Sequence, residues 1–333
     1  MGVSVRDVAA AASVSVGTVS NVLNRPAKVA PATVERVMQA IDDLGFVRND
    51  AARQLRAGRS RSIGIVVLDV GNPFFAEVVR GAETRAAEEG MSVLVGNSDE
   101  NADREDGYLD LFREQRVNGV LITPASSDVP RLQRVQDAGI PVILVDSEIG
   151  DGSFVSVAVD DVQGGYLAAS HLLSKGRRRL AFVAGPPSIR QVSDRLEGAR
   201  RAVGEVSGAE LEVIETAALT VLHGRTAGEA LAARDAAERP DAVFAANDLL
   251  AVGVLQAFTA APDVSVPGDI ALIGYDDIDF AASTTVPLSS VRQPAHLLGY
   301  TAVDLLMKEL DHASGDRHVR FQPELVARQS TAG

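Results

Sequence analysis

The sequence predicts a small all-α head at the N-terminus, followed by a large α/β body built on parallel sheets. Amphipathic segments at helical spacing recur within residues 5–44, whereas short apolar runs alternate with helical stretches from residue 62 onward. The charge balance changes at the same point. Residues 1–61 hold nine basic and five acidic side chains, and the remaining 272 residues hold 23 basic and 40 acidic ones. This contrast indicates that only the head meets nucleic acid.

Composition narrows the class of protein. The chain has 333 residues, 46% of them hydrophobic and 23% charged, which is typical of a globular protein with two or three domains. Because there is no cysteine, disulfides, thiolate nucleophiles and cysteine-ligated metals are excluded. No apolar run reaches the length of a membrane span, and the N-terminal apolar stretch contains many Ser and Thr residues. We therefore expect a cytoplasmic protein that has neither a signal peptide nor a membrane segment.

The first two helices of the head follow from capping and spacing. Ser4 and Asp7 fit the capping-box pattern, which predicts a helix at about 5–11. After a short break, apolar residues at helical spacing predict a second helix at about 15–23. Its inner face consists of Val19, Val22 and Leu23. Its outer face consists of Val16, Gly17, Ser20 and Asn21.

A third helix is predicted at about 31–44, because Pro31 suits a first turn and Gly45 suits a helix end. Its apolar stripe has five members: Val34, Val37, Met38, Ile41 and Leu44. Three short helices with a tight turn between the first two form a helix-turn-helix unit.

Several runs of the head carry a family resemblance: VRDVA at 5–9, ASVS at 12–15, TVSNVLN at 18–24 and LGF at 44–46. In this order and spacing the head resembles the DNA-binding domain of the lactose/galactose repressor (LacI/GalR) family. The resemblance assigns residues 1–47 to that domain. It also implies that the second helix enters the major groove of DNA.

The resemblance further implies how the head contacts DNA. Val16, Gly17 and Asn21 would set operator preference. Val16 can contact a thymine methyl and Asn21 can bond adenine, whereas Gly17 offers no side chain. Phosphate contacts that fix the register are implied for five polar residues, with helix capping as the alternative for the hydroxyls: Thr18, Ser20, Asn24, Lys28 and Thr33.

Residues 48–61 connect the head to the body. They contain five Arg, and Leu55 is their single large apolar side chain, so composition alone indicates an exposed linker. In the family that the head resembles, this stretch is a hinge helix that orders on the operator. A leucine from each of two subunits then enters the minor groove, and Leu55 matches that wedge position.

The body, residues 62–333, shows a βαβ rhythm that predicts parallel sheets with helices on both faces, divided into two lobes. Strands are predicted at 63–68, 91–96, 120–123, 142–146, 180–184, 243–246 and 270–274. Helices are predicted at about 74–89, 104–115, 130–138, 161–174, 194–203, 225–237 and 248–260. No GxxxxGK[ST] or GxGxxG motif follows a strand, so no nucleotide cofactor is expected.

The family resemblance extends over the body through motifs such as NPFF at 72–75, AND at 246–248 and GYDD at 274–277. It implies a core similar to that of periplasmic sugar-binding proteins, with two Rossmann-like lobes, three crossovers and a ligand in the cleft between the lobes. The crossovers are placed near residues 160, 290 and 321. The lobes are placed at about 62–160 plus 291–321, and at about 161–290 plus 322–333.

Polar side chains stand at the carboxyl ends of predicted strands, where open α/β sheets bind ligands. Carboxylates and amides can bond the hydroxyls of a sugar, a guanidinium can donate, and a phenyl ring can cover an apolar face. The resemblance implies an effector site of seven residues: Asp69, Asn72, Phe75, Asp146, Arg195, Asn247 and Asp276. Capping or interlobe ion pairing is the alternative for Asp69 and Asp276. Leu219 departs from the family, since sugar-binding members place an aromatic residue there.

Other clusters have simpler interpretations. The acidic run at 276–279 could form a metal site or a catalytic pair, but it lacks the spacing of a calcium loop. The five histidines show no paired arrangement, so no metal site is expected. We interpret His171 as an ordinary helix residue. Arg177, Arg178 and Arg179 follow a helix and a glycine, which favours a capping turn over a DNA contact.

These observations predict a non-enzymatic transcriptional regulator of the repressor type. It would bind a palindromic operator on double-stranded DNA and respond to a sugar-like effector. Because a two-fold operator requires two heads, we expect a homodimer. Two alternatives stay open: a cytoplasmic sugar-binding module, which leaves the basic head without a purpose, and a carbohydrate-acting enzyme that uses Asp146 and Asp276 as a carboxylate pair.

Overall fold

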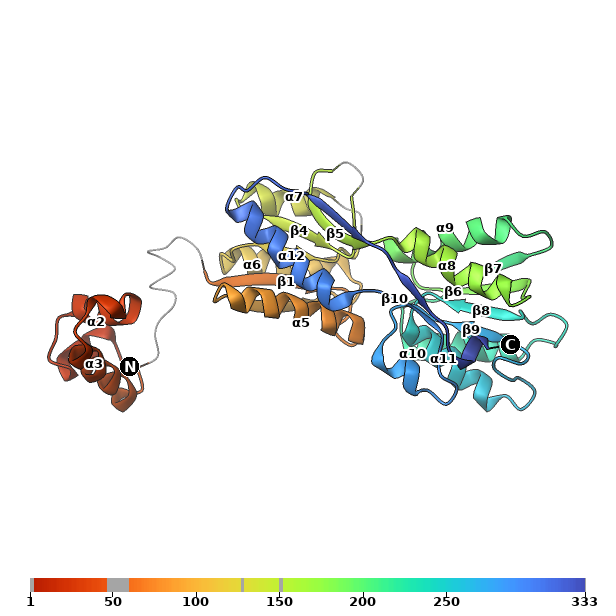
Figure 1. Ribbon diagram of the computed structural model, residues 1–333, viewed down its shortest axis with the longest axis horizontal. Helices are drawn as coiled ribbons and strands as arrows, with labels where there is room; N and C mark the ends of the chain where they lie inside the picture. Colours follow the sequence, from red (N-terminus) through yellow and green to blue (C-terminus); the bar gives the residue numbers. More distant parts are fainter. Residues whose placement is uncertain (1–2, 47–59, 127–128, 150–151, 333) are drawn as a thin grey trace. The chain divides into compact units, whose positions relative to one another are not determined.

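The computed structural model describes residues 3–46, 60–126, 129–149 and 152–332 (Figure 1). The chain divides into two compact units, residues 1–60 and 61–333. Leu55 and most of the predicted hinge lie outside the described residues.

The head has the three predicted helices: α1 (Val5–Ala11), α2 (Val16–Asn24) and α3 (Pro31–Leu44), with a 3₁₀ turn η1 (Pro26–Lys28) after α2. The predicted capping pair forms, because the Asp7 carboxylate accepts from the Ser4 amide at 2.8 Å and from its hydroxyl at 2.7 Å. Gly45 ends α3 in the left-handed region, at φ 60°.

The head has a small core of its own, to which all three helices contribute: Val8, Ala9, Ala12, Val19, Val22, Val37 and Ala40. Two of the five residues that were predicted to form the buried apolar stripe of α3 are exposed. Met38 and Leu44 are 43% and 37% exposed, and the small side chain of Ala40 is buried instead. Two short helices can cover only a narrow strip of α3, so the outer members of the stripe stay in solvent.

The first lobe is built on a six-stranded parallel sheet in the order β11-β5-β4-β3-β1-β2. The strands are β1 (Ser62–Val67), β2 (Ser92–Asn97), β3 (Val120–Ile122), β4 (Val142–Val145), β5 (Val155–Val159) and β11 (His318–Phe321). The helices are α5 (Pro73–Glu88), α6 (Ala102–Glu114), α7 (Val129–Asp137) and α12 (Ala295–Leu310). Side chains of α5 and α12 pack against the strand residues that point to one face of the sheet. Side chains of α6 and α7 pack against the alternate strand residues, which point to the opposite face, so helices cover both faces.

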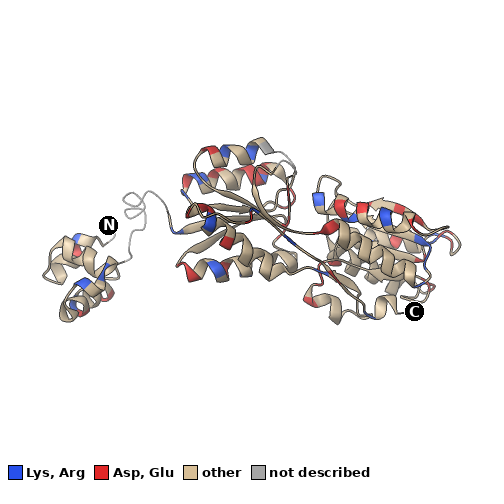
Figure 2. Cartoon of the chain, turned by 45° about the horizontal axis from the view of Figure 1, so that its top comes forward, with Lys and Arg blue, Asp and Glu red and all other residues tan. Residues whose placement is uncertain are grey.

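The second lobe is built on a four-stranded parallel sheet in the order β7-β6-β8-β9. Its strands are β6 (Arg179–Ala184), β7 (Glu210–Glu215), β8 (Ala242–Ala245) and β9 (Ala271–Ile273). Its helices are α8 (Asp161–Ser174), α9 (Arg190–Gly204), α10 (Val221–Ala232) and α11 (Asp248–Ala260), with 3₁₀ turns η2 (Asp279–Ser283) and η3 (Gln329–Thr331). Figure 2 shows that charged residues colour the outer helices of the body, while few of them lie on the central strands.

The chain crosses between the lobes after β5 and again along β10 (Ser290–Arg292) and β12 (Glu324–Val326). The last two segments pair antiparallel with each other. They lie between the two sheets in Figure 1. These segments fall at the three positions near which crossovers were expected.

Each predicted strand and helix has a counterpart in the structure, but five strands and one helix of the described residues were missed. The missed strands are β5, β7, β10, β11 and β12. Strand β7 lies at a sheet edge and alternates acidic with apolar residues, which is the pattern of a half-buried strand. It was missed because only continuous apolar runs were taken as strands. The missed helix is α12, which follows a crossover where no further βαβ unit was expected.

Three helix pairs of the body pack closely: α5 with α12, α8 with α9 and α10 with α11. Each pair has a glycine on both helices at the crossing: Gly81 and Gly299, Gly165 and Gly198, Gly224 and Gly253. A Cβ at Gly198 would lie 1.9 Å from the Val162 carbonyl oxygen, and one at Gly165 would lie 2.0 Å from the Arg195 carbonyl oxygen. This close crossing places Arg195 of α9 beside the first turn of α8.

Replacing Gly198 by Ala is expected to lower the free energy of unfolding by about 3 kcal/mol, because the new methyl group would force two helix backbones apart. Urea unfolding of the purified protein measures this change. Gly107→Ala is the matched control: Gly107 is also inside a helix, but nothing lies within 4 Å of its Cβ position. That variant should be stabilised by up to about 1 kcal/mol. Equal effects of the two substitutions would contradict the crossing argument.

None of the helices among the described residues combines the length and the apolar character that a membrane-spanning helix requires.

Candidate functional site

A pocket lies between the two lobes of the body and holds about 410 Å³ of empty space, including the part open to solvent. Thirteen residues line it, and all seven residues of the predicted effector site are among them. The predicted members are Asp69, Asn72, Phe75, Asp146, Arg195, Asn247 and Asp276. The others are Leu68, Phe74, Glu100, Ile189, Gln191 and Leu219.

Strand ends and helix starts position these side chains. Asp146 directly follows β4, and Asn247 comes just after β8. Asn72 and Asn247 cap α5 and α11: their side-chain oxygens accept from the backbone amides of Phe74 at 3.0 Å and Leu250 at 2.9 Å. Capping leaves the amide nitrogens of both residues directed at the cleft.

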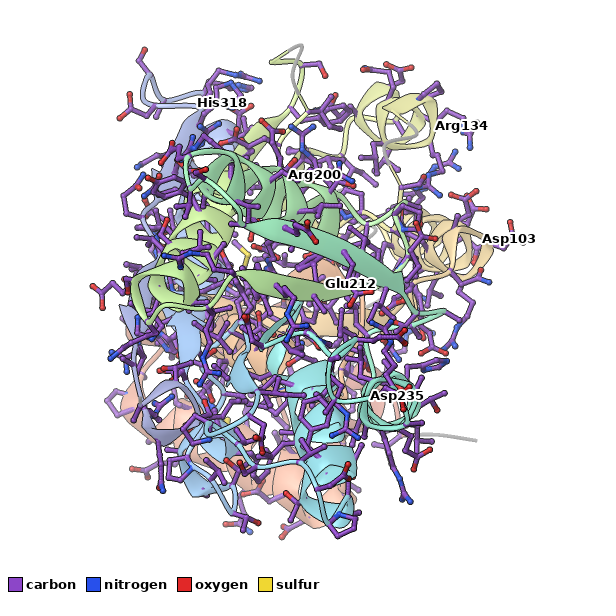
Figure 3. The ribbon with its side chains drawn as sticks, turned by 90° about the vertical axis from the view of Figure 1, so that its right-hand side faces the viewer. Asp103, Arg134, Arg200, Glu212, Asp235 and His318 are labelled. Atoms are coloured by element: carbon purple, nitrogen blue, oxygen red, sulfur yellow. The ribbon has the colours of Figure 1, made fainter. Side chains whose placement is uncertain are left out.

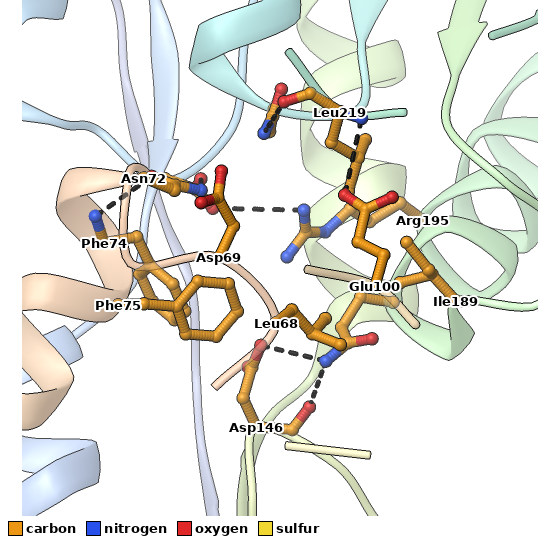
Figure 4. Close-up of a pocket in the computed structure, with 13 residues that line it drawn as sticks. Leu68, Asp69, Asn72, Phe74, Phe75, Glu100, Asp146, Ile189, Arg195 and Leu219 are labelled. Atoms are coloured by element: carbon orange, nitrogen blue, oxygen red, sulfur yellow. Dashed lines mark hydrogen bonds and ion pairs between the residues drawn. The ribbon is translucent and has the colours of Figure 1, made fainter. Parts of the chain in front are cut away.

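Asp276 joins the two lobes. Its Oδ2 accepts from Nδ2 of Asn72 at 3.1 Å, and its Oδ1 accepts from Nε2 of Gln293 at 2.8 Å. The residue is 7% exposed and has φ 103°, a backbone conformation that residues other than glycine rarely adopt. Burial raises the pKa of its carboxyl to about 6. Figure 4 shows Asn72 and Arg195 on opposite sides of the pocket.

Arg195 is the charged centre of the pocket and is 4% exposed. Its Nε donates to Oδ1 of Asp161 at 2.7 Å, and its Nη1 donates to the carbonyl oxygen of Ala246 at 2.8 Å. Nη1 also lies 3.9 Å from Oδ1 of Asp276. The guanidinium stacks on the ring of Tyr275, with its Cζ 3.6 Å from the centroid. These partners fix its orientation before any ligand arrives.

Asp146 stands on the lobe 1 side of the pocket, where Gln191 of α9 reaches across to it. Nε2 of Gln191 donates to the Asp146 carbonyl oxygen at 2.6 Å and to its Oδ2 at 3.0 Å. Oδ1 of Asp146 is buried and has no hydrogen-bond partner among the described residues. Burial raises the pKa of this carboxyl, and the neighbouring charge of Asp161 raises it further. A ligand hydroxyl would satisfy the open oxygen.

Apolar side chains complete the pocket. The rings of Phe74 and Phe75 meet edge to face, with centroids 5.0 Å apart, and line the pocket together with Ile189. Leu219 does line the pocket, at the position where an aromatic platform was expected from the family. Its side chain supplies apolar contact without a ring that could stack on a sugar.

Three polar residues of the site were missed by sequence reasoning: Glu100, Gln191 and Gln293. Glu100 has φ 57° and accepts from the backbone amide of Leu219, across the lobes, at 3.4 Å. Gln191 belongs to the start of α9, which was predicted to begin four residues later. Gln293 belongs to the RQP motif at 292–294 that marks the second crossover, so the motif itself could have identified it.

The high pKa of Asp276 implies a dependence of stability on pH. The folded protein binds this proton more tightly than the unfolded chain does, so unfolding free energy falls as pH rises from 3.8 to about 6. The difference of about 2 pKa units corresponds to about 3 kcal/mol above pH 6. Asp276→Asn should therefore be more stable than wild type at pH 7.5, with little difference at pH 4. Urea unfolding at pH 4, 5, 6 and 7.5 checks this, with the exposed Asp279→Asn as control.

One member of the acidic run at 276–279 is held by two arginines. Asp277 forms ion pairs with Arg292 at 2.8 Å and Arg328 at 2.6 Å. No cluster of three or more potential metal ligands occurs among the described residues.

Two other predictions concern helix α8: the arginine run that follows it and His171 within it. Nη1 of Arg178 donates to the Leu173 carbonyl oxygen in the last turn of α8, which confirms the capping turn. His171 lies in α8, as predicted, and its Nε2 is 2.7 Å from the hydroxyl of Thr331 in η3.

In the head, the outer face of α2 is open to solvent. Val16, Gly17 and Asn21 are exposed, while Thr18 and Ser20 are half-buried. Three of the predicted phosphate-contacting groups also bond locally. The Thr18 hydroxyl lies 2.9 Å from that of Ser15, and Nδ2 of Asn24 donates to the Ser20 carbonyl oxygen at 2.8 Å and to the Ser20 hydroxyl at 3.3 Å. Lys28 is exposed in η1, and Thr33 is half-buried near the start of α3. Their roles on DNA stay predictions.

Comparison with known proteins agrees with this architecture. Residues 4–49 match the model of the bacterial regulatory proteins of the lacI family, and residues 169–331 match a periplasmic binding protein-like domain. The chain is 33% identical to the HTH-type transcriptional repressor PurR of Photobacterium profundum, over 98% of both chains. It is also 33% identical to the ribose operon repressor of Escherichia coli (strain K12), over 98% of this chain and 99% of that one.

Solved structures agree as well. The lac repressor dimer bound to operator and the anti-inducer ONPF superimposes with a TM-score of 0.86 at 26% identity, covering both chains completely. A LacI family transcriptional regulator from Enterococcus faecium with bound ribose superimposes with a TM-score of 0.73 at 29% identity, over 81% of this chain and 98% of that one.

A helix-turn-helix head joined to a two-lobed body with a polar cleft defines a class of DNA-binding regulators that carry a periplasmic-binding-protein-like domain. Within that class, the chain belongs to the lacI family of bacterial regulatory proteins. It is a transcriptional regulator of that family.

Proposed function

We propose that the protein is a repressor that binds a palindromic operator as a homodimer, and that a small polyhydroxylated ring compound in the interlobe pocket controls its affinity for DNA. The observation that carries this proposal is the convergence of all seven predicted effector residues on one pocket. The relatives named as transcriptional repressors support the DNA-binding part. The wedge role of Leu55 and the base and phosphate contacts of the head belong to this proposal.

The chemistry of the pocket fits a ring with several hydroxyls. Oδ1 of Asp146 and the amide nitrogen of Asn72 provide an acceptor and a donor on the first lobe. Phe75 supplies an apolar surface that can cover one face of a ring. D-ribose is the first compound to test, because one relative is a ribose operon repressor and one structural neighbour holds ribose.

Dimer formation is supported by the neighbouring lac repressor structure, which is a dimer on its operator. Exposed apolar side chains on the body are available for an interface between subunits: Leu94, Val95, Leu222 and Phe280. With both heads held by one dimer, the two recognition helices can meet two half-sites of a palindrome.

An enzymatic role for the cleft receives less support. Both carboxylate oxygens of Asp276 already accept hydrogen bonds from the amides of Asn72 and Gln293. A general acid or base requires an oxygen that can reach the substrate. We therefore propose that the pocket binds its ligand without changing it.

Selection of DNA from a randomised duplex library by the full-length protein tests the proposed function. We expect enrichment of a palindrome with two half-sites whose centres lie about one helical turn apart. Fluorescence anisotropy of the enriched duplex should then show affinity that falls steeply with salt. Failure to enrich any sequence would contradict the assignment of specific DNA binding.

A further inference from the structure

Asp69 and Glu100 both line the interlobe pocket, and we call this pair of carboxylates the cleft mouth. Both side chains are half-buried, unlike the fully buried Asp146 and Asp276. Figure 4 shows their carboxyl groups directed into the pocket from two loops of the first lobe.

The protein leaves most of the hydrogen-bonding capacity of the cleft mouth unused. Oδ1 of Asp69 accepts from the backbone amide of Gly71 at 2.7 Å. Oε1 of Glu100 accepts from the backbone amide of Leu219 in a long bond of 3.4 Å. The second oxygen of each carboxylate has no hydrogen-bond donor among the described residues. Two acceptors therefore face the space that a ligand would occupy.

Acidic side chains outnumber basic ones in the pocket lining. Four carboxylates line the pocket, against the single guanidinium of Arg195. That guanidinium is already bound to Asp161 and lies close to Asp276. Burial raises the pKa of the Glu100 carboxyl, and the neighbouring charges of Asp69 and Asp99 raise it further. The negative charge of the cleft mouth is thus not offset by a basic side chain.

We propose that the cleft mouth makes this regulator selective for a cationic effector, namely a hydroxylated ring that carries a protonated amine. This inference rests on the proposed function of the pocket as the effector site. The amine donates hydrogen bonds to the open oxygens of Asp69 and Glu100, and its charge offsets theirs. The ring hydroxyls bond the deeper groups of the pocket. Phosphorylated or carboxylated rings are repelled at the mouth.

A matched pair of ring compounds tests the proposal by titration calorimetry with the full-length protein at pH 7.5. The cationic probe is 1,4-dideoxy-1,4-imino-D-ribitol, whose ring nitrogen is protonated at this pH. The neutral probe is 1,4-anhydro-D-ribitol, which has the same hydroxyls and an oxygen in the ring. We expect the cationic probe to bind at least about tenfold more tightly, as a charge-assisted hydrogen bond implies.

Variants of Asp69 and Glu100 test whether these two residues cause the preference for the cationic probe. Glu100→Gln and Asp69→Asn keep the size of each side chain and remove its charge, so each should reduce the preference for the cationic probe severalfold. The control, Glu114→Gln, changes an exposed residue of α6 outside the pocket and should leave the preference unchanged. A second readout is the salt dependence of binding, which should be steeper for the cationic probe.

The outcomes separate the two proposals. Equal affinity for the two probes, or an unchanged preference in both variants, overturns the inference and leaves the effector site in place. Absence of binding for both probes and for D-ribose contradicts the effector site itself, and the inference falls with it.

Discussion

Replacing Arg195 by Ala is expected to lower the free energy of unfolding by about 3–5 kcal/mol and to abolish effector binding. Arg195 holds Asp161 at 2.7 Å and lies near Asp276, all within the buried centre of the body. Its charge lowers the pKa of both carboxyls against the effect of burial. Without the guanidinium, buried carboxylates lose the positive charge that offsets their own.

Urea unfolding measured beside effector titration checks this prediction. The matched control is Arg200→Ala, because Arg200 lies on the same helix but is exposed at the surface (Figure 3). The control should change the unfolding free energy by less than about 0.5 kcal/mol. If Arg195→Ala unfolds at the same urea concentration as wild type, then the buried network does not depend on Arg195.

Removing residues 1–60 is expected to reduce affinity for the selected operator by roughly a thousandfold or more, while effector binding stays intact. The head has its own core, and the chain divides at this point into separate compact units. The basic excess also belongs to the N-terminal part of the sequence, and the body is strongly acidic. Its acidic surface repels the phosphate backbone.

Anisotropy titrations of the selected duplex with residues 61–333 and with the full chain measure the loss. Circular dichroism and calorimetry with the effector serve as controls that the shortened protein is folded. Operator binding by residues 61–333 at full strength would place DNA recognition in the body and refute the role of α2.

The sequence predicted the head closely because its signals are local. A capping pair, a proline at a first turn and a glycine at a helix end each mark a boundary within a few residues. The errors at Met38 and Leu44 have a tertiary origin: periodicity shows which residues share a face, but not how much of that face the neighbouring helices cover.

The site was predictable only in part. Asp69, Asp146, Asn247 and Asp276 stand where strand ends place binding groups, so topology alone suggests them. Glu100 and Gln191 come from a turn and from the start of a helix, and no pattern separates them from ordinary polar surface residues. The buried ion pair between Arg195 and Asp161 could not be predicted either, because the sequence indicated only that Asp161 begins a helix.

The central claim is that a ligand in the interlobe pocket controls DNA binding through the residues that join the lobes. The most direct measurement is the operator affinity of wild type and Asp276→Asn, with and without D-ribose at a concentration that saturates the wild type. We predict that the ligand shifts the operator affinity of wild type about fivefold or more, and that the shift is much smaller in Asp276→Asn at the same concentration. Binding of D-ribose to wild type without any shift in operator affinity, or an equal shift in the variant, would contradict the claim.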